Sequence, residues 1–477
     1  MATDQSPENP FFEFEQDDEE EERSIDVLPL ATKDTEPIPS LRDVRAQVVS
    51  LGPDGKIQSA PREDDDEEQG EMLVVLEDPE GLAPKPAALS MWAYAVATLF
   101  DGRRSAQAAA EAFEKKYKQP IPTQQILDLQ RELDQSLFLY SRRFEKVVRK
   151  QIRGYMDEEV RPASHAGVSY PDQPDELHET IDSFFTDADG PGQTALDIAL
   201  ARVTPVSNAT QQDNIRALML PHIDLRQGGA TYAHGYAELL ARSDADLFFI
   251  LGVAHHAPGE GLFYVSQKSF ATPVGTVKTE RSIAARLQAA ADVESPMAEL
   301  AHRVEFSVEF QAVLLASLLG RRKRDFEIVP VLCGPVEPFL ATDTSPFEAE
   351  SFKRFVAALH NEMAISNRRW CVICSVDLSH VGPEFNHSVM MTEKMLLPVE
   401  RMDKKWLKTV EQLDSRAAWA EMERTQNSRH VDAVLSVLTM LETCRGNIER
   451  GKLLHYDQMM KPATHSAVSF ASMSFSR

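Results

Sequence analysis

From about Gly154 onward, the chain alternates short apolar runs with amphipathic segments of helical period, and this alternation limits the fold more than any other sequence feature. Four runs are nearly continuous in apolar residues: Ile215 to Leu220, Leu247 to Leu251, Glu327 to Leu332 and Trp370 to Val376. Such strands are typical of a parallel sheet that is covered on both faces. The pattern therefore predicts an α/β domain over residues 154–477, with a mostly parallel central sheet flanked by helices.

The predicted helices fill the gaps between these strands, and in each helix the apolar residues fall on one stripe. The clearest examples are Ala230 to Arg242, Arg281 to Ala290, Val308 to Leu319, Ser351 to Met363 and Asp432 to Cys444. Ligands of such sheets bind beyond the carboxyl ends of the strands. Candidate site residues should therefore be sought directly after the four apolar runs.

Histidines occur where three of these predicted strands end. His222 follows the first run, His255 and His256 follow the second, and His380 follows the last. A single histidine there is more often a hydrogen-bonded or surface residue than a ligand. Several imidazoles delivered to one point, however, can hold iron, copper or zinc. We therefore predict a metal site at the carboxyl edge of the sheet.

Asp377 lies three residues before His380 and has several possible roles. It could be a further ligand, a partner that orients an imidazole, or a general base. A cap of the following turn is an equally good structural explanation. The sequence leaves these alternatives open.

The first 70 residues are strongly acidic, with 21 Asp or Glu against 6 Lys or Arg, within a chain of net charge −25. The runs Asp17 to Glu22 and Asp64 to Glu68 bury too little apolar surface to offset the entropy of ordering. We therefore expect residues 1–70 to be a disordered acidic tail and linker. Such a tail would be repelled by nucleic acid and by anionic membranes, so we expect neither as a partner.

A small helical or winged-helix domain is predicted over residues 71–145. Helical spacing appears in LSMWAYAVATLFDG and SAQAAAEAFEKKYK, separated by Asp101 and Gly102, and again from Thr123 to Leu137. The order of these segments resembles the PqqD-like family, whose winged-helix modules bind peptides or partner proteins, although any three-helix scaffold would fit as well. The third helix is acidic, which argues against DNA reading.

The four cysteines are too few and too scattered for a disulfide framework in a chain of this length. Cys371 and Cys374 form a C-x-x-C pair inside an apolar run that reads as a buried strand, without the helix start that a redox pair needs. The N-terminus has no basic, apolar leader, and no segment approaches the roughly 20 apolar residues of a membrane span. A cytoplasmic protein without a membrane role is expected.

From Arg161 to the C-terminus the chain resembles the Memo family, known in prokaryotes as AmmeMemoRadiSam system protein B. The resemblance begins at RPASHAGVSYP (Arg161 to Pro171), where family members have an "R…a.AG.WYP" start. It continues in order through LPHIDLRQGGATYAHGY, FFILGVAHHAP, EFSVEFQAVLL, EIVPVLCG and SVDLSHVG. The resemblance implies a fold similar to the class III extradiol dioxygenases, with a shallow metal pocket at the carboxyl edge of the sheet.

By this resemblance His222 and His256 match two imidazole ligands, and His380 matches a third histidine of the pocket. The implied cofactor is a divalent transition metal, with iron as the first choice and copper or zinc as alternatives. His255, His380 and Asp377 are the candidate catalytic residues, because the histidines could move a proton and the carboxylate could act as a base.

The chain departs from the family at two pocket positions. Asn427 stands where the family has the cysteine of a "CGRHP" stretch, and Phe306 stands where it has a histidine. A carboxamide is a much weaker ligand than a thiolate, which speaks against tight copper binding. Glu305 and Glu309 could supply a carboxylate nearby, and two imidazoles with one carboxylate would favour non-haem iron(II).

Two hypotheses follow for function. The first is a metal-dependent oxidoreductase similar to the dioxygenases, acting on a catechol or a similar small aromatic. The second is a non-catalytic module that has lost full metal chemistry, with a small-molecule or peptide ligand in the pocket and a protein partner bound through the N-terminal domain. Fold alone does not decide between them.

Overall fold

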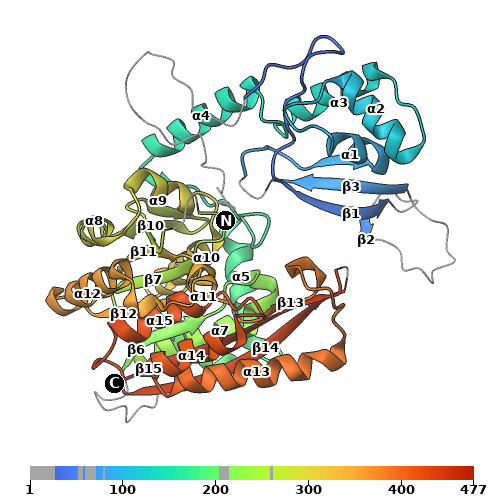
Figure 1. Cartoon of the computed structure of the whole chain (residues 1–477). Coiled ribbons are helices and arrows are strands. Elements are labelled where there is room, and N and C mark those ends of the chain that lie inside the picture. Colours follow the sequence, from blue (N-terminus) through green and yellow to red (C-terminus); the bar gives the residue numbers. More distant parts are fainter. Residues whose placement is uncertain are drawn as a thin grey trace. The chain divides into compact units, whose positions relative to one another are not determined.

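A computed structural model describes residues 27–51, 57–59, 71–78, 81–202, 214–257, 261–462 and 464–477. The chain divides into two compact units, Met1–Asp157 and Glu158–Arg477 (Figure 1). Much of the segment expected to be disordered, namely residues 1–26, 52–56 and 60–70, lies outside the described residues.

The first unit combines helices with a four-stranded antiparallel sheet of order β2-β1-β3-β4. Its strands are β1 (Arg45–Leu51), β2 (Ile57–Ser59), β3 (Glu71–Glu77) and β4 (Ala87–Ser90), and its helices are α1 (Met91–Ala97), α2 (Ala106–Tyr117), α3 (Thr123–Gln135) and α4 (Arg142–Asp157). The first unit therefore includes two strands, β1 and β2, that precede residue 71, where we placed the start of the small domain. The reason is non-local, because β1 pairs with β3 along its whole length.

The second unit is built on one large sheet whose centre is parallel. The order is β13-β15-β6-β12-β7-β11-β10-β9-β5, with β14 on β15 and β8 on β11. The bounds are β5 Val160–Arg161, β6 Ile215–Leu220, β7 Leu247–Val253, β8 Phe263–Val265, β9 Ser269–Thr272, β10 Gly275–Thr279, β11 Glu327–Cys333, β12 Trp370–Ser375, β13 His380–Val381, β14 Arg450–Lys461 and β15 Ser466–Ser476.

The four predicted strands are β6, β12, β7 and β11, and they lie side by side in parallel. Antiparallel strands extend the sheet on both sides, through β15 next to β6 and through β9 next to β10. The predicted α/β class with a mostly parallel sheet is confirmed.

Alternate residues of each central strand enter two separate cores. In β6, Ala217 and Met219 belong to one core, whereas Leu218 and Leu220 belong to the other. The first core is closed by α8 (Arg281–Ala290), α11 (Glu337–Ala341), α12 (Glu350–Ile365), α13 (Glu393–Glu411), α14 (Ser415–Thr425) and α15 (Val434–Thr443). The second is closed by α5 (Pro174–Thr186), α6 (Gln193–Ala199), α7 (Leu225–Arg242), α9 (Ser295–His302) and α10 (Phe306–Arg321).

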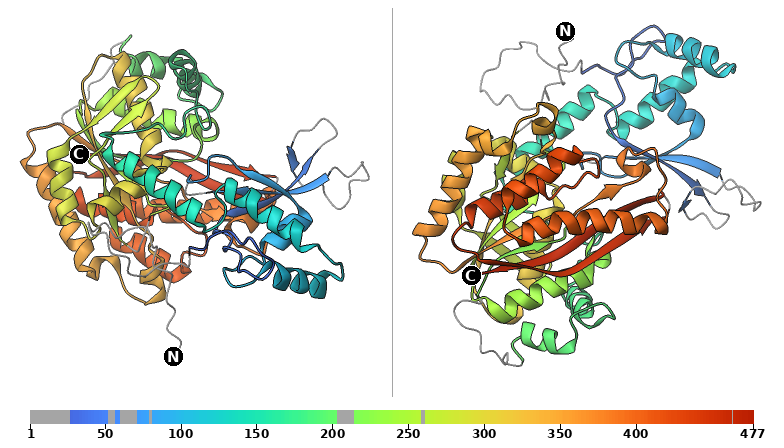
Figure 2. Two further views of the ribbon diagram at one scale, coloured as in Figure 1. Left: turned by 90° about the horizontal axis from the view of Figure 1, so that it is seen from above. Right: turned by 60° about the horizontal axis from the view of Figure 1, so that its bottom comes forward.

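This two-sided cover explains why the central strands are apolar without alternation. Figure 2 shows the helices on either side of the sheet, with α13 running along β14. Among the described helices none combines the length and the apolar character needed to cross a membrane.

A buried ion pair ties β5 to the start of α10. The Arg161 and Glu309 side chains are both fully buried and form a salt bridge. Arg161 also donates to the carbonyl oxygen of Glu305, at 2.7 Å, and Tyr170 donates its hydroxyl to Glu309. Burial alone would raise the pKa of Glu309, but the guanidinium of Arg161 holds that pKa below its ordinary value.

We expect Arg161→Met to destabilise the second unit by about 3–5 kcal/mol, because Glu309 would be left as a buried, unpaired charge. Urea unfolding of the full chain, followed by tryptophan fluorescence, measures this change. Arg281→Met is the control, since Arg281 and Glu159 form an exposed pair worth less than about 1 kcal/mol. Equal unfolding midpoints for the two variants would contradict the prediction.

Candidate metal centre

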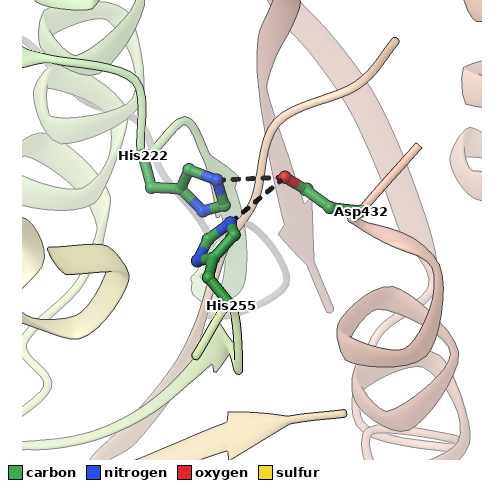
Figure 3. A group of neighbouring side chains, drawn as sticks. All are labelled: His222, His255 and Asp432. Carbon is green, nitrogen blue, oxygen red and sulfur yellow. Dashed lines mark ion pairs between the residues drawn. The ribbon is translucent and has the colours of Figure 1, made fainter. Parts of the chain in front are cut away.

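Three side chains from separate segments converge at the carboxyl edge of the sheet: His222, His255 and Asp432. His222 follows β6, His255 follows β7, and Asp432 precedes α15. Their candidate ligand atoms all lie within 4.8 Å of one another. In Figure 3, one ring nitrogen of each histidine points at the same Asp432 oxygen.

His222 is buried and held through its Nδ1 atom. Nδ1 lies 2.9 Å from the carbonyl oxygen of Ser375, so it carries the proton and donates. Nε2 is then the nitrogen that can bind a metal ion or a second proton, and it lies 3.1 Å from Asp432 Oδ2. The backbone N–H of His222 donates to Asp377 Oδ1 at 3.0 Å. A fixed tautomer of this kind is the usual preparation of a histidine ligand.

His255 is prepared in the same way by a carboxylate. Its Nδ1 lies 3.1 Å from the oxygens of Glu305, and its backbone N–H donates to Glu305 Oε2 at 3.2 Å. Glu305 is the N-cap of α10, which fixes its position. The His255 ring stacks on Phe306 with centroids 4.8 Å apart, and its Nε2 lies 3.8 Å from Asp432 Oδ2.

Asp432 presents one oxygen to this point and uses the other as an anchor. Oδ1 accepts the backbone N–H of Asp377 at 2.9 Å. Oδ2 is buried and accepts no hydrogen bond of normal geometry from the described residues, although imidazole nitrogens approach it. A buried carboxylate oxygen that faces the Nε2 atoms of two histidines fits a bound cation, which would take the place of the protons on those nitrogens.

The two remaining predicted histidines lie around this group. His380, at the start of β13, directs Nε2 to within 3.8 Å of Asp432 Oδ2, while its Nδ1 lies 3.1 Å from the carbonyl oxygens of Leu378 and His430. The His256 ring centroid lies 6.2 Å from that of His255. The three-residue group thus contains His255 where the resemblance pointed to His256, because consecutive residues after a strand project in different directions.

Carboxylates other than Asp432 support the group. Asp377 holds the backbone of His222 and is itself buried. Burial and the nearby charge of Asp432 raise the pKa of Asp377, although the attraction of His222 acts to lower it. Glu305, which we considered as a nearby carboxylate, orients His255, and Glu309 pairs with Arg161. Sequence reasoning missed Asp432, although it opens the last predicted helix directly after the NSRHV stretch.

Asn427 shapes the turn that carries Asp432. Its Oδ1 accepts the backbone N–H of Val431 at 2.9 Å, and its Nδ2 donates to the Val431 carbonyl at 3.1 Å and to Glu337 Oε1 at 3.2 Å. The amide is thereby committed to holding the turn. Asn427, at the expected cysteine position, therefore holds the turn in place, and the carboxylate of the site belongs to Asp432, five residues further along the chain.

The charges of the site are strongly coupled. Burial by itself lowers the pKa of His222, but the attraction of Asp432 and Asp377 raises it to about 9. For His255, burial again lowers the pKa, and Glu305 with Asp432 raises it to about 10. Burial would raise the pKa of Asp432, but His222 holds it well below its ordinary value. When no metal ion is bound, both imidazoles are therefore protonated at neutral pH.

A small cavity of about 160 Å³ borders Asp432. It is lined by Val253, Ala254, Gly334, Pro335, Val336, Glu337, His430, Val431 and Asp432. These residues come from the ends of β7 and β11 and from the turn before α15. A roughly 150 Å³ cavity can hold a single benzene ring.

Comparison with known sequences identifies a family model and relatives that match this chain. The family model described as Memo-like protein matches residues 161–474. A MEMO1 family protein of Aquifex aeolicus is 25% identical over 404 residues, covering 84% of this chain and 95% of the relative. One from Thermus thermophilus is 24% identical over 373 residues (78% and 99%), and one from Methanocaldococcus jannaschii 30% over 228 residues (47% and 71%). The Aquifex similarity covers more residues than the second unit contains, so it extends into the first unit.

We expect metal affinity to rise with pH throughout the range below about pH 9, because a metal ion must displace the protons that the raised pKa values of His222 and His255 retain. The rise is about tenfold per displaced proton and pH unit. Competition between the full chain and a chromophoric chelator for zinc, which is redox-silent, measures it at several pH values. His455→Ala is the control, since His455 stacks on His234 outside the group. A pH-independent affinity would contradict the prediction.

Proposed function

Since the chain belongs to the family of Memo-like proteins, we propose that its second unit holds one divalent transition metal ion between His222, His255 and Asp432 and oxidises a small aromatic substrate there. The observation that carries the proposal is the convergence of two Nε2 atoms on one buried carboxylate oxygen. Each ring is oriented by a separate partner at Nδ1, as metal-binding histidines are.

The ligand set favours iron, with copper or zinc as alternatives. Two imidazoles and one carboxylate are the donors typical of non-haem iron(II), which when bound retains open positions for O₂ and a substrate. Copper(I) prefers soft sulfur ligands. The four cysteines are buried as free thiols and none belongs to the group, and Asn427 supplies an amide that is already engaged.

The other residues of the site would bind, orient and move protons. His380 donates its Nδ1 proton to backbone carbonyls, so its Nε2 is available to accept a proton from a substrate hydroxyl. Asp377 holds the backbone of His222 through a hydrogen bond of 3.0 Å. Phe306 covers the His255 ring and keeps water from that side of the imidazole. The cavity beside Asp432 would receive the aromatic ring.

A second candidate function is a non-catalytic binding module whose first unit docks a protein partner. It is favoured by Trp92, which is 48% exposed although its ring packs edge-on against Phe113 and Tyr117 at 5.5 and 5.7 Å. Exposed but rigid aromatic side chains are typical anchors of interfaces. This account requires that the protein still bind its protein partner when His222 and His255 are replaced, and that the Trp92→Ala variant lose this binding.

Elemental mass spectrometry on the anaerobically purified full chain tests the metal centre. We expect near-stoichiometric iron that is lost in His222→Ala, His255→Ala and Asp432→Ala, because each removes one of three ligands. His256→Ala is the matched control and should keep its metal. Loss in His256→Ala with retention in His255→Ala would instead support the ligands expected from the family resemblance.

Absence of iron, copper and zinc, even after reconstitution of correctly folded wild-type protein, would rule out the metal centre and leave the binding module as the better account. Asp432→Cys extends the test. It places a soft thiolate at the site, so the iron content should fall relative to copper.

A further inference from the structure

The cavity beside Asp432 has two walls that are tied together by one side chain. One wall is the segment that follows β11, from Gly334 to Glu337 at the start of α11, and the other is the turn from His430 to Asp432. Asn427 links them, since its Nδ2 donates both to Glu337 Oε1 and to the carbonyl oxygen of Val431. Glu337 is therefore held at a set position along the cavity.

The charged residues that line the cavity are acidic. Most lining residues are apolar or small, and the charged ones are Glu337 and Asp432, both acidic. Neither lysine nor arginine lines the cavity among the described residues. Because the charge of Asp432 is offset by the imidazoles at its Oδ2, Glu337 is the lining charge that a ligand meets, and it repels a carboxylate and attracts an ammonium group.

Glu337 has an oxygen available for a ligand. Its Oε1 accepts the hydrogen bond from Asn427, and the described residues place no donor on Oε2. The side chain is exposed to solvent at the cavity wall, so the attraction that it offers is screened and modest. Asp432, in contrast, directs Oδ2 to the histidines.

His430 supplies an aromatic wall. Its backbone adopts a left-handed conformation with φ of 49°, which is uncommon for a residue with a side chain and is held here by the Asn427 turn. Its ring packs edge-on against His387, with centroids 5.0 Å apart, and His387 is itself hydrogen-bonded to the carbonyl oxygen of Ser428. A flat ring can therefore pack against a fixed imidazole.

We propose that the cavity selects phenols that carry a cationic arm, with the ring between the apolar lining and His430, the hydroxyl towards Asp432 and the ammonium group at Glu337. This inference rests on the proposed function, because it names the substrate class of the same site. It makes Glu337 a specificity-determining residue. The apolar lining, which includes Val253 and Val431, limits the ligand to about one ring.

Three phenols with nearly the same shape and different charge test the proposal: tyramine (cationic), tyrosol (neutral) and 4-hydroxyphenylacetate (anionic). Binding to the full chain is measured by calorimetry, with zinc as a redox-silent metal and also without metal. We expect tyramine to bind roughly fivefold more tightly than tyrosol, the factor of one screened charge pair, and 4-hydroxyphenylacetate to bind least.

Variants of Glu337 locate the selectivity. Glu337→Gln should bring tyramine to the affinity of tyrosol while leaving tyrosol unchanged, and Glu337→Lys should reverse the order towards 4-hydroxyphenylacetate. Glu350→Gln, an exposed change outside the cavity lining, is the matched control and should keep the wild-type order. Because tyrosol reports the cavity itself, an altered tyrosol affinity identifies a variant that has disturbed the fold.

The outcomes separate the two proposals. Retention of the charge order in protein that binds no metal would support the substrate class and contradict the metal centre. Equal binding of the three phenols by metal-loaded protein, or an order that Glu337→Gln leaves unchanged, would overturn the substrate class alone. If none of the three phenols binds to metal-loaded protein, the substrate class is also overturned.

Discussion

Burial of the parallel sheet on both faces is the constraint on which the second unit depends. In each central strand, successive side chains enter opposite cores, as Ala217 and Leu218 do in β6. The backbone polar groups of these strands are used within the sheet. No position inside a central strand is therefore open for chemistry, and the histidines of the site come from residues that follow β6, β7 and β12, while Asp432 comes from the turn before α15.

The positions after the strands do not by themselves form a site, and the orientation of each ring comes from a second set of contacts. Glu305, at the N-cap of α10, orients His255 and holds its backbone, and the start of that helix is held in turn by Arg161. The Ser375 carbonyl, at the end of β12, orients His222. Chains of buried partners of this kind fix tautomers and ring planes.

Much of the fold could be predicted from the sequence because the central strands carry their pattern locally. Runs such as Trp370 to Val376 are too apolar and too short for any other element. The pairing of β1 with β3 in the first unit, and of β15 with β6 in the second, could not be predicted in this way, since each depends on a partner distant along the chain. The strand β15, for example, alternates serine with apolar residues and is nevertheless buried throughout.

The sequence by itself determined the α/β class, the family and the edge of the sheet at which histidines gather, because hydrophobic periodicity and ordered motifs are local properties. Only the tertiary structure decided which side chains share a point. It placed His255 beside His222, and it brought in Asp432, which is distant from both histidines along the chain. The physical reason is that convergence depends on how a turn is clamped and how a ring is hydrogen-bonded, and both are set by partners that meet only when the two cores close around the sheet.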